Sequence, residues 1–333
     1  MRTLVVSDLH IGAGRGRMRL DDPRALAVLA GAASGADRLV LLGDVIELRE
    51  GPLQDALAAA SRVLPQLVTG LGHGREVVYV FGNHDHQLQL HPAALERVEG
   101  LLRQGGAAVS FAYPGLWLRE DVYAHHGHYL DRHTTTPAFE RLAAGAMARF
   151  IKLPLAEMSG PEDYERVLAP VYAWMFAMAQ HGPRDAGGPE GGGQVRLLAR
   201  LRNARLPQSL VLETGVRGLV AALSRAGLGP LTGDLSDARL RRASLIAYGQ
   251  VLAVLGLAPR YALFGHSHRA GPLPHDLPSE WVTPAGAALL NTGCWVNEHF
   301  AYEHAGENPY RPGYAVWVDD DGPPRLVNLL AGG

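Results

Sequence analysis

Short apolar runs alternate with longer amphipathic segments along the first third of the chain and again near its end. Most of the runs are rich in β-branched and aliphatic residues and stop abruptly at a polar residue or a glycine. Nearly continuous apolar runs suit strands that are buried on both faces, between layers of helices. We therefore expect strands at residues 3–7, 38–42, 77–81, 121–124, 261–264, 289–292, 314–318 and 326–330.

The segments between the early runs are rich in alanine and leucine, and they predict helices at residues 23–33, 53–71 and 92–104. Alternation of strands and helices predicts a layered α/β fold. In such folds ligands gather beyond the carboxyl ends of the strands, which directs attention to the residues that follow each run.

The stretch between His128 and Arg260 differs, because its pattern is helical almost throughout. We expect helices at 137–153, 161–180, 194–205, 210–226 and 236–257, with a flexible glycine-rich loop at 187–193. We interpret residues 132–259 as a helical cap inserted into a domain made of residues 1–131 and 260–333. An independent domain with its own function is the alternative.

Composition narrows the class of protein. The 333 residues are 47% hydrophobic, which allows a sizeable core, and the formal net charge of −2 argues against a general nucleic-acid binder. Cys294 is the single cysteine, so neither a disulfide framework nor a thiolate zinc cluster can form. The chain opens without a signal-peptide pattern, and no apolar run reaches the roughly 18 residues of a spanning helix. We predict a soluble cytoplasmic protein.

Polar clusters follow five of the predicted strands. They read Asp8-x-His10, Gly43-Asp44, Gly82-Asn83-His84-Asp85, His125-His126-Gly127-His128 and Gly265-His266-Ser267-His268. Most of these motifs, taken singly, have a plain structural explanation such as a tight turn. Together, at five strand ends, they supply the oxygen and imidazole ligands of a two-metal hydrolytic site.

In this order the motifs resemble the calcineurin-like metallophosphoesterase superfamily, over residues 1–130 and 260–300. The resemblance implies a four-layer sandwich, in which two mixed β-sheets are flanked by helices, here with a helical cap insertion. It also implies a two-metal-dependent phosphohydrolase that cleaves a phosphate ester or pyrophosphate with metal-activated water.

The resemblance assigns roles by position. The first metal would be held by Asp8, His10, Asp44 and His268, and the second by Asp44, Asn83, His126 and His266, with Asp44 as the bridge. His84 would stabilise the transition state or protonate the leaving oxygen, and Asp85 would orient it. We expect two divalent ions, with Mn²⁺ as first choice and Fe, Zn or Co as alternatives, because these ligands discriminate weakly between metals.

Four further residues are candidate substrate contacts: His125, His128, Arg132 and Arg269. His125 serves equally well as a core residue. The expected substrate is a phosphorylated small molecule or a nucleotide-type compound, since no evident surface for nucleic acid accompanies the motifs. The pattern carries no indication of an oligomeric state.

The position of the insertion resembles that in UDP-2,3-diacylglucosamine hydrolases, in which it covers acyl chains. Aromatic and methionine residues between Phe150 and Met178 would suit an acyl chain or peripheral membrane contact, or they simply hold the cap helices together. His84 stands where that group usually has arginine, so cyclic-nucleotide phosphodiesterase and phosphomonoesterase activities stay open. A non-catalytic metal-binding scaffold is the alternative of another class, and the filled ligand positions argue against it.

Overall fold

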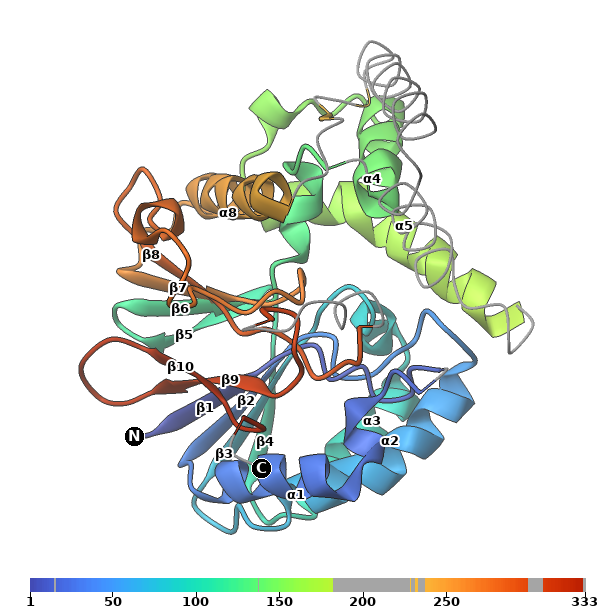
Figure 1. Ribbon diagram of the computed structural model, residues 1–333. Helices are drawn as coiled ribbons and strands as arrows, with labels where there is room; N and C mark the ends of the chain where they lie inside the picture. The colour runs from blue at the N-terminus through green and yellow to red at the C-terminus, as the bar shows by residue number, and fades with distance from the viewer. Residues whose placement is uncertain are drawn as a thin grey trace, which may run out of the picture. The chain divides into compact units, whose positions relative to one another are not determined.

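The computed structural model describes residues 1–14, 16–136, 138–181, 228, 231–232, 237–298 and 308–331. The chain divides into two compact units (Figure 1). The first comprises Met1–His128, Phe176–Arg184 and Pro259–Gly333, and the second comprises Tyr129–Met175 and Asp185–Ala258. The helices predicted at 194–205 and 210–226, and the glycine-rich loop at 187–193, lie outside the described residues.

The larger sheet of the first unit has six strands in the order β10-β9-β1-β2-β3-β4. They are β1 (Thr3–Val6), β2 (Arg38–Leu42), β3 (Glu76–Val80), β4 (Ala108–Ala112), β9 (Tyr314–Val318) and β10 (Arg325–Asn328). Strands β1 to β4 run parallel, whereas β9 is antiparallel to β1 and β10 to β9. Because Leu42 lies opposite Val80, the carboxyl ends of β2 and β3 meet at one edge.

The smaller sheet has four strands in the order β5-β6-β7-β8. They are β5 (Gly115–Arg119), β6 (Val122–His125), β7 (Tyr261–Phe264) and β8 (Ala288–Asn291). Strands β6, β7 and β8 are parallel, and β5 is antiparallel to β6. The second unit therefore enters the chain between two strands that are neighbours in space.

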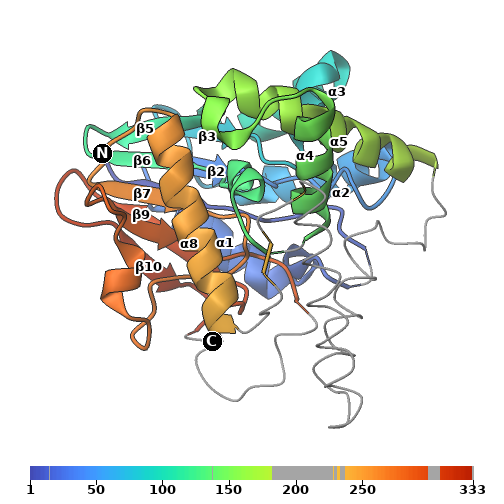
Figure 2. The same cartoon turned by 90° about the horizontal axis from the view of Figure 1, so that it is seen from above.

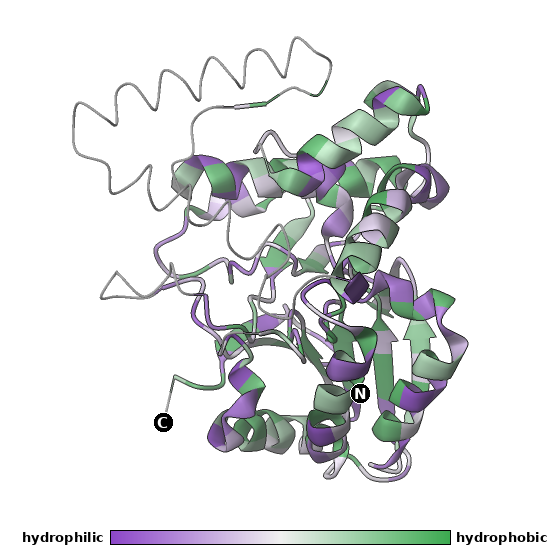
Figure 3. Ribbon diagram, turned by 90° about the vertical axis from the view of Figure 1, so that its right-hand side faces the viewer, coloured by the Kyte–Doolittle hydropathy of each residue, from purple (hydrophilic) through white to green (hydrophobic). Residues whose placement is uncertain are grey.

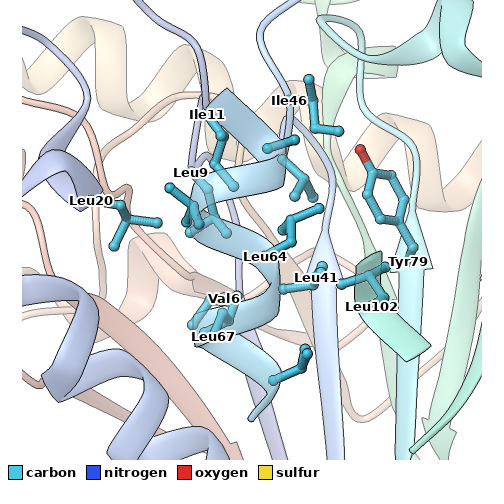
Figure 4. Packing of buried hydrophobic residues seen from close by; sticks show 14 of the residues in the cluster. Val6, Leu9, Ile11, Leu20, Leu41, Ile46, Leu64, Leu67, Tyr79 and Leu102 are labelled. Carbon is cyan, nitrogen blue, oxygen red and sulfur yellow. The ribbon is translucent and has the colours of Figure 1, made fainter. Parts of the chain in front are cut away.

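Side chains that alternate along the strands build two cores. Val5, Val40 and Val78 belong to a core that also contains Val122 and Leu263 of the smaller sheet. The residues between them point the other way, toward α1 (Pro23–Ser34), α2 (Leu53–Val68) and α3 (Pro92–Arg103). Figure 4 shows this second core, in which Leu64 and Leu67 of α2 pack near Val6 and Leu41.

This arrangement confirms the predicted fold class, two mixed sheets flanked by helices. It also explains the continuous apolar runs, because both faces of the central strands are buried. In Figure 3 the strands are accordingly coloured mostly as hydrophobic, whereas the helices carry many hydrophilic residues.

Local signals set the beginning of α1. The side chain of Asp22 accepts a hydrogen bond from the backbone N–H of Arg24 at 2.9 Å, and Pro23 occupies the first helical position. Both features favour a helix start, since the cap satisfies an otherwise unpaired donor and proline needs none there. Helix α1 thus begins where the sequence predicts.

The described part of the second unit is largely helical, as predicted. Its described helices are α4 (Phe139–Phe150), most of α5 (Pro161–His181) and α8 (Asp237–Val254). Figures 1 and 2 show α4 and α5 side by side, and Phe139 stacks on Trp174 with ring centroids 5.7 Å apart. Within the described residues, no helix combines the length and hydrophobicity that crossing a membrane requires.

Candidate metal centre

Five of the predicted metal ligands adopt left-handed backbone conformations just beyond the strand ends. Their φ angles are 55° for Asp8, 42° for His10, 51° for Asp44, 66° for His266 and 58° for His268. Such conformations are uncommon for residues other than glycine, and they concentrate at functional sites, where the surrounding structure has to hold them.

Backbone hydrogen bonds between neighbouring loops hold these turns in place. The N–H of Asp8 donates to the carbonyl of Gly43 at 3.1 Å, and the N–H of His10 donates to the carbonyl of Asp44 at 2.9 Å. The pairing of β1 with β2 thus continues past the strands into the polar loops. As a result the first two motifs share one rigid edge.

Two glycines allow ligands from different strands to approach. A Cβ atom on Gly82 would lie 2.6 Å from the backbone nitrogen of Asp44 and 2.7 Å from the ring of His126. On Gly265, a Cβ atom would lie 2.9 Å from the Cβ of Ser7, in a space that also adjoins the Asp8 carboxylate. Glycine before Asn83 and before His266 is therefore a packing requirement of the centre.

One group of ligand atoms comes from Asp8, His10 and His268. The Nε2 atoms of the two histidines lie 3.1 Å apart, and Nε2 of His268 lies 3.3 Å from Oδ1 of Asp8. Oδ2 of Asp8 accepts hydrogen bonds from the His266 N–H and the Ser7 hydroxyl. Oδ1 is buried without a hydrogen-bond partner among the described residues, as expected for an oxygen that faces a cation.

A second group comes from Asp44, Asn83, His126 and His266. Nε2 of His126 lies 3.1 Å from Oδ2 of Asp44 and 3.3 Å from Oδ1 of Asn83. Nδ1 of His266 lies 3.0 Å from the same Asn83 oxygen. Oδ2 of Asp44 also lies 3.8 Å from Nε2 of His10 in the first group, so one carboxylate oxygen faces both groups.

The amide of Asn83 provides a test of whether a metal fits. With Oδ1 turned inward, the oxygen faces the ring nitrogens of His126 and His266, an arrangement that a shared cation stabilises. With the amide reversed, its nitrogen would donate to Asp44, His126 and His266, and its oxygen would accept from Arg49 at 2.5 Å. Because amide nitrogen is not a metal ligand, the inward oxygen is the orientation that suits an ion, and the donor set fits hard divalent cations.

Three of the ligand histidines are fixed through their other ring nitrogen. Nδ1 of His10 lies 2.7 Å from Glu47, and Nδ1 of His268 lies 2.6 Å from Glu298. Nδ1 of His126 lies 2.9 Å from the carbonyl oxygen of Leu42. These contacts turn Nε2 of each ring toward the ligand groups, a common arrangement around metals.

Sequence reasoning missed both glutamates. Glu47 and Glu298 are buried, with exposed fractions of 1% and 8%. A signal existed for Glu47, because it interrupts the apolar residues Val45, Ile46 and Leu48. A buried carboxylate three residues after a metal-binding aspartate needs a partner, and here the partners are histidines.

Glu47 also contacts His84, the histidine for which the sequence predicts a role in the reaction. Its carboxylate oxygens lie 2.8 and 2.9 Å from Nδ1 of His84. The carboxylate of Asp85 instead accepts hydrogen bonds from the N–H groups of Gly82 and Val45 and from the Tyr79 hydroxyl. The carboxylate next to Nδ1 of His84 is therefore that of Glu47, and an orienting role for Asp85 stays a prediction.

The charges of the centre favour protonated histidines and ionised acids in the metal-free protein. Burial opposes the charged form of His10, but contacts with Asp8 and Glu47 outweigh it and raise its pKa to about 10. The pKa of His268 is likewise raised to about 10 against burial, by Asp8 and Glu298. Burial lowers the pKa of His84 to about 4 despite Glu47. Metal binding at His10 and His268 must therefore displace protons.

The four predicted substrate contacts are all buried. His125 and His128 are fully buried: Nδ1 of His125 accepts from the Gly127 N–H at 2.7 Å, and His128 stacks on Tyr113. Their surroundings are those of core residues, which suits the alternative role given to His125, and contact with substrate stays a prediction.

The two arginines are also buried. Arg269 forms a two-pronged ion pair with Asp276, with N–O distances of 2.6 and 3.0 Å, and is thus committed to a structural partner. A contact of Arg269 with a substrate phosphate stays a prediction. Arg132 belongs to the second unit and donates to the carbonyl oxygen of Leu153 at 3.3 Å.

Comparisons with known proteins identify the family of the chain. Residues 1–196 match the profile of the calcineurin-like phosphoesterase family. A dimetal phosphatase from Danio rerio has a similar structure, with 13% sequence identity, 99% of each chain covered and a TM-score of 0.39. No curated protein sequence matches this chain.

Proposed function

This chain belongs to the calcineurin-like phosphoesterase family and is a metal-dependent phosphoesterase, and we propose that it hydrolyses a phosphate ester or anhydride with two divalent ions. The proposed ligands are Asp8, His10, Asp44, Asn83, His126, His266 and His268. The observation that carries this proposal is the convergence of acceptor atoms around Asp44 Oδ2, which lies within 4 Å of histidines from both ligand groups. Mn²⁺ is the proposed metal, because carboxylate and imidazole ligands suit it.

When bound, such ions lower the pKa of a water molecule and neutralise charge on the phosphoryl oxygens. The chain's own residues supply orientation and proton handling. Glu47 holds His84 by Nδ1, and the His84 side chain is 14% exposed while that of Glu47 is fully buried. His84 is therefore the histidine that we assign to the transition state or the leaving oxygen.

The decisive experiment measures turnover of bis(p-nitrophenyl) phosphate, p-nitrophenyl phosphate and a UDP-sugar with and without Mn²⁺. We expect Asp44→Asn to lose metal binding and activity together. His84→Asn should keep its metal and lose roughly 10²–10⁴-fold in kcat, the usual contribution of a positioned acid or base. His181→Ala is the matched control, because that histidine ends α5 and is exposed.

Metal analysis of each variant separates the outcomes. A wild-type protein that binds no divalent ion would overturn the proposal in favour of a metal-free function. A protein that binds two ions, yet leaves every phosphate ester and anhydride intact, would support the scaffold alternative.

A UDP-linked sugar lipid is the second candidate substrate, and one observation favours it. Phe150, the last residue of α4, is 83% exposed, and Trp174 of α5 is 48% exposed. Met178 of α5 is also exposed, at 49%, whereas Met158 and Tyr172 of the same region are buried. We propose that the second unit is a cap whose exposed aromatic residues contact acyl chains.

Acylated and unacylated UDP-glucosamine distinguish this candidate from a general diesterase. A preference for the acylated compound that Phe150→Ser abolishes would support it. Equal rates on both compounds, or faster turnover of a cyclic nucleotide, would exclude it.

A further inference from the structure

The second unit contains two buried guanidinium groups that its own residues satisfy only in part. Arg141 is fully buried and Arg132 is 5% exposed. Nε of Arg141 donates to the carbonyl of Thr134 at 2.7 Å, and Nη2 of Arg132 donates to the carbonyl of Leu153 at 3.3 Å. Among the described residues, Nη1 and Nη2 of Arg141 and Nε of Arg132 have no hydrogen-bond partner.

Unpaired buried cations are costly, because each loses its hydration without gaining a counter-charge. Burial, together with the neighbouring charge of Arg141, lowers the pKa of Arg132 to about 10. Burial also lowers the pKa of Arg141, whereas the negative charge of Asp131 favours its charged form. Among the described residues, these interactions therefore set one acid, Asp131, against two cations.

The adjacent His133 does not offset the positive charge of the two arginines. His133 lies 2.5 Å from the hydroxyl of Tyr164 through Nε2. Burial and the two arginines lower the pKa of His133 to about 4, so its ring is neutral at physiological pH. The cluster therefore keeps an excess of positive charge and of N–H donors.

We propose that Arg132 and Arg141 form an anion site that binds a phosphate group, built from residues that are not ligands of the metal centre. A phosphate offers several acceptor oxygens, so it can accept from both guanidinium groups at once, and arginine is the residue best suited to such contacts. The phosphate is either the free ion or the phosphoryl group of a nucleotide.

Calorimetric titration of the full chain with inorganic phosphate, in the presence of Mn²⁺ and after its removal, tests the site. We expect saturable binding that persists without metal and that weakens at least tenfold in Arg141→Met. Arg166→Met is the matched control, because that side chain is 59% exposed on α5, and it should bind as wild type. Titration with uridine monophosphate shows which source of phosphate is preferred.

Thermal unfolding supplies an independent readout that does not depend on activity. In phosphate-free buffer Arg141→Met should melt at a higher temperature than wild type, because the substitution removes a buried unpaired charge. Saturating phosphate should raise the melting temperature of wild type and leave that of the variant unchanged. Arg132→Met provides a second variant if Arg141→Met does not fold.

Two results would overturn the proposal. Phosphate binding that disappears when the metal is removed would assign it to the metal centre. Equal binding by wild type, Arg141→Met and Arg132→Met would show that neither guanidinium takes part.

Discussion

The carboxylate of Glu47 contacts two imidazole rings. One belongs to His10, a predicted metal ligand, and the other belongs to His84. Its own backbone position is also tied to the centre, since its N–H donates to the carbonyl of Ile11 at 2.9 Å. A single side chain therefore links the geometry of the metal ligands with that of the histidine assigned to the reaction.

At this scale we predict the effect of Glu47→Gln. The amide keeps the shape but loses a negative charge and one acceptor, so it can no longer satisfy both rings. We expect Mn²⁺ affinity to fall roughly 10–100-fold, the usual effect of removing a residue that orients a ligand, with a fall in kcat as well. Calorimetric Mn²⁺ titration measures the first effect.

Glu99→Gln is the control, because Glu99 pairs with Arg103 on the surface of α3 and should leave Mn²⁺ binding unchanged. If Glu47→Gln bound Mn²⁺ as tightly as wild type, the orienting role of Glu47 would be wrong.

At the scale of elements, the polar loops at the strand ends can pack closely because glycine leaves room for the neighbouring loop. We predict that Gly82→Ala forces apart the backbone nitrogen of Asp44 and the ring of His126, which a Cβ atom would overlap. Overpacking of this kind costs about 1–3 kcal/mol of unfolding free energy, and it should also abolish tight Mn²⁺ binding.

Gly100→Ala is also a glycine-to-alanine substitution, but we expect it to raise the free energy of unfolding. Gly100 lies within α3, and nothing occupies the space that its Cβ atom would take. The free energy of unfolding of this variant should be about 0.5–1 kcal/mol higher than that of wild type, because alanine favours the helix more than glycine does. Urea unfolding of both variants compares them directly, and a neutral Gly82→Ala would contradict the packing argument.

The elements that could be predicted from the sequence are those with strong periodicity. Strands buried on both faces, such as β2 and β7, appear as unbroken apolar runs, and both were predicted with their observed bounds. Strands β4 and β5 escaped prediction because they are only partly buried and contain polar residues such as Ser110 and Arg119. Neither strand shows the strict alternation of apolar and polar residues that separates a half-buried strand from a loop.

Some residues of the candidate site could likewise be predicted from the sequence, and others could not. Residues at strand ends, such as Asp44, could be located because their type is unusual after an apolar run. Partners reached through folding could not, since Glu298 meets His268 from a distant loop. The ion pair of Arg269 with Asp276 could not be predicted either, because no local sequence pattern indicates it.

At the scale of the whole molecule, the protonated histidines couple stability to pH. In the metal-free protein His10 and His268 have pKa values raised to about 10, above the ordinary value of 6.5. The stability they contribute is fully present below pH 6.5 and is lost as the pH rises through 10. The melting temperature of the metal-free protein should therefore fall between pH 7 and 10.

The metal-loaded protein provides the comparison. Its ligand histidines carry no proton to lose, so its melting temperature should change less over the same range. Scanning calorimetry of both forms at several pH values measures the difference. Parallel curves for the two forms would show that these histidines do not set the pH dependence.

Strands β6 and β7 are partners in the smaller sheet, although the second unit separates them in the chain. During synthesis the ribosome releases Asp8, Asp44 and His126 well before His266. The entropic cost of bringing β6 and β7 together grows only slowly with the number of residues between them. The delay before they can pair is instead set by the time needed to translate those residues. The growing chain therefore cannot assemble the complete set of predicted ligands until residues 266–268 have emerged, and we expect no metal-dependent activity before that point.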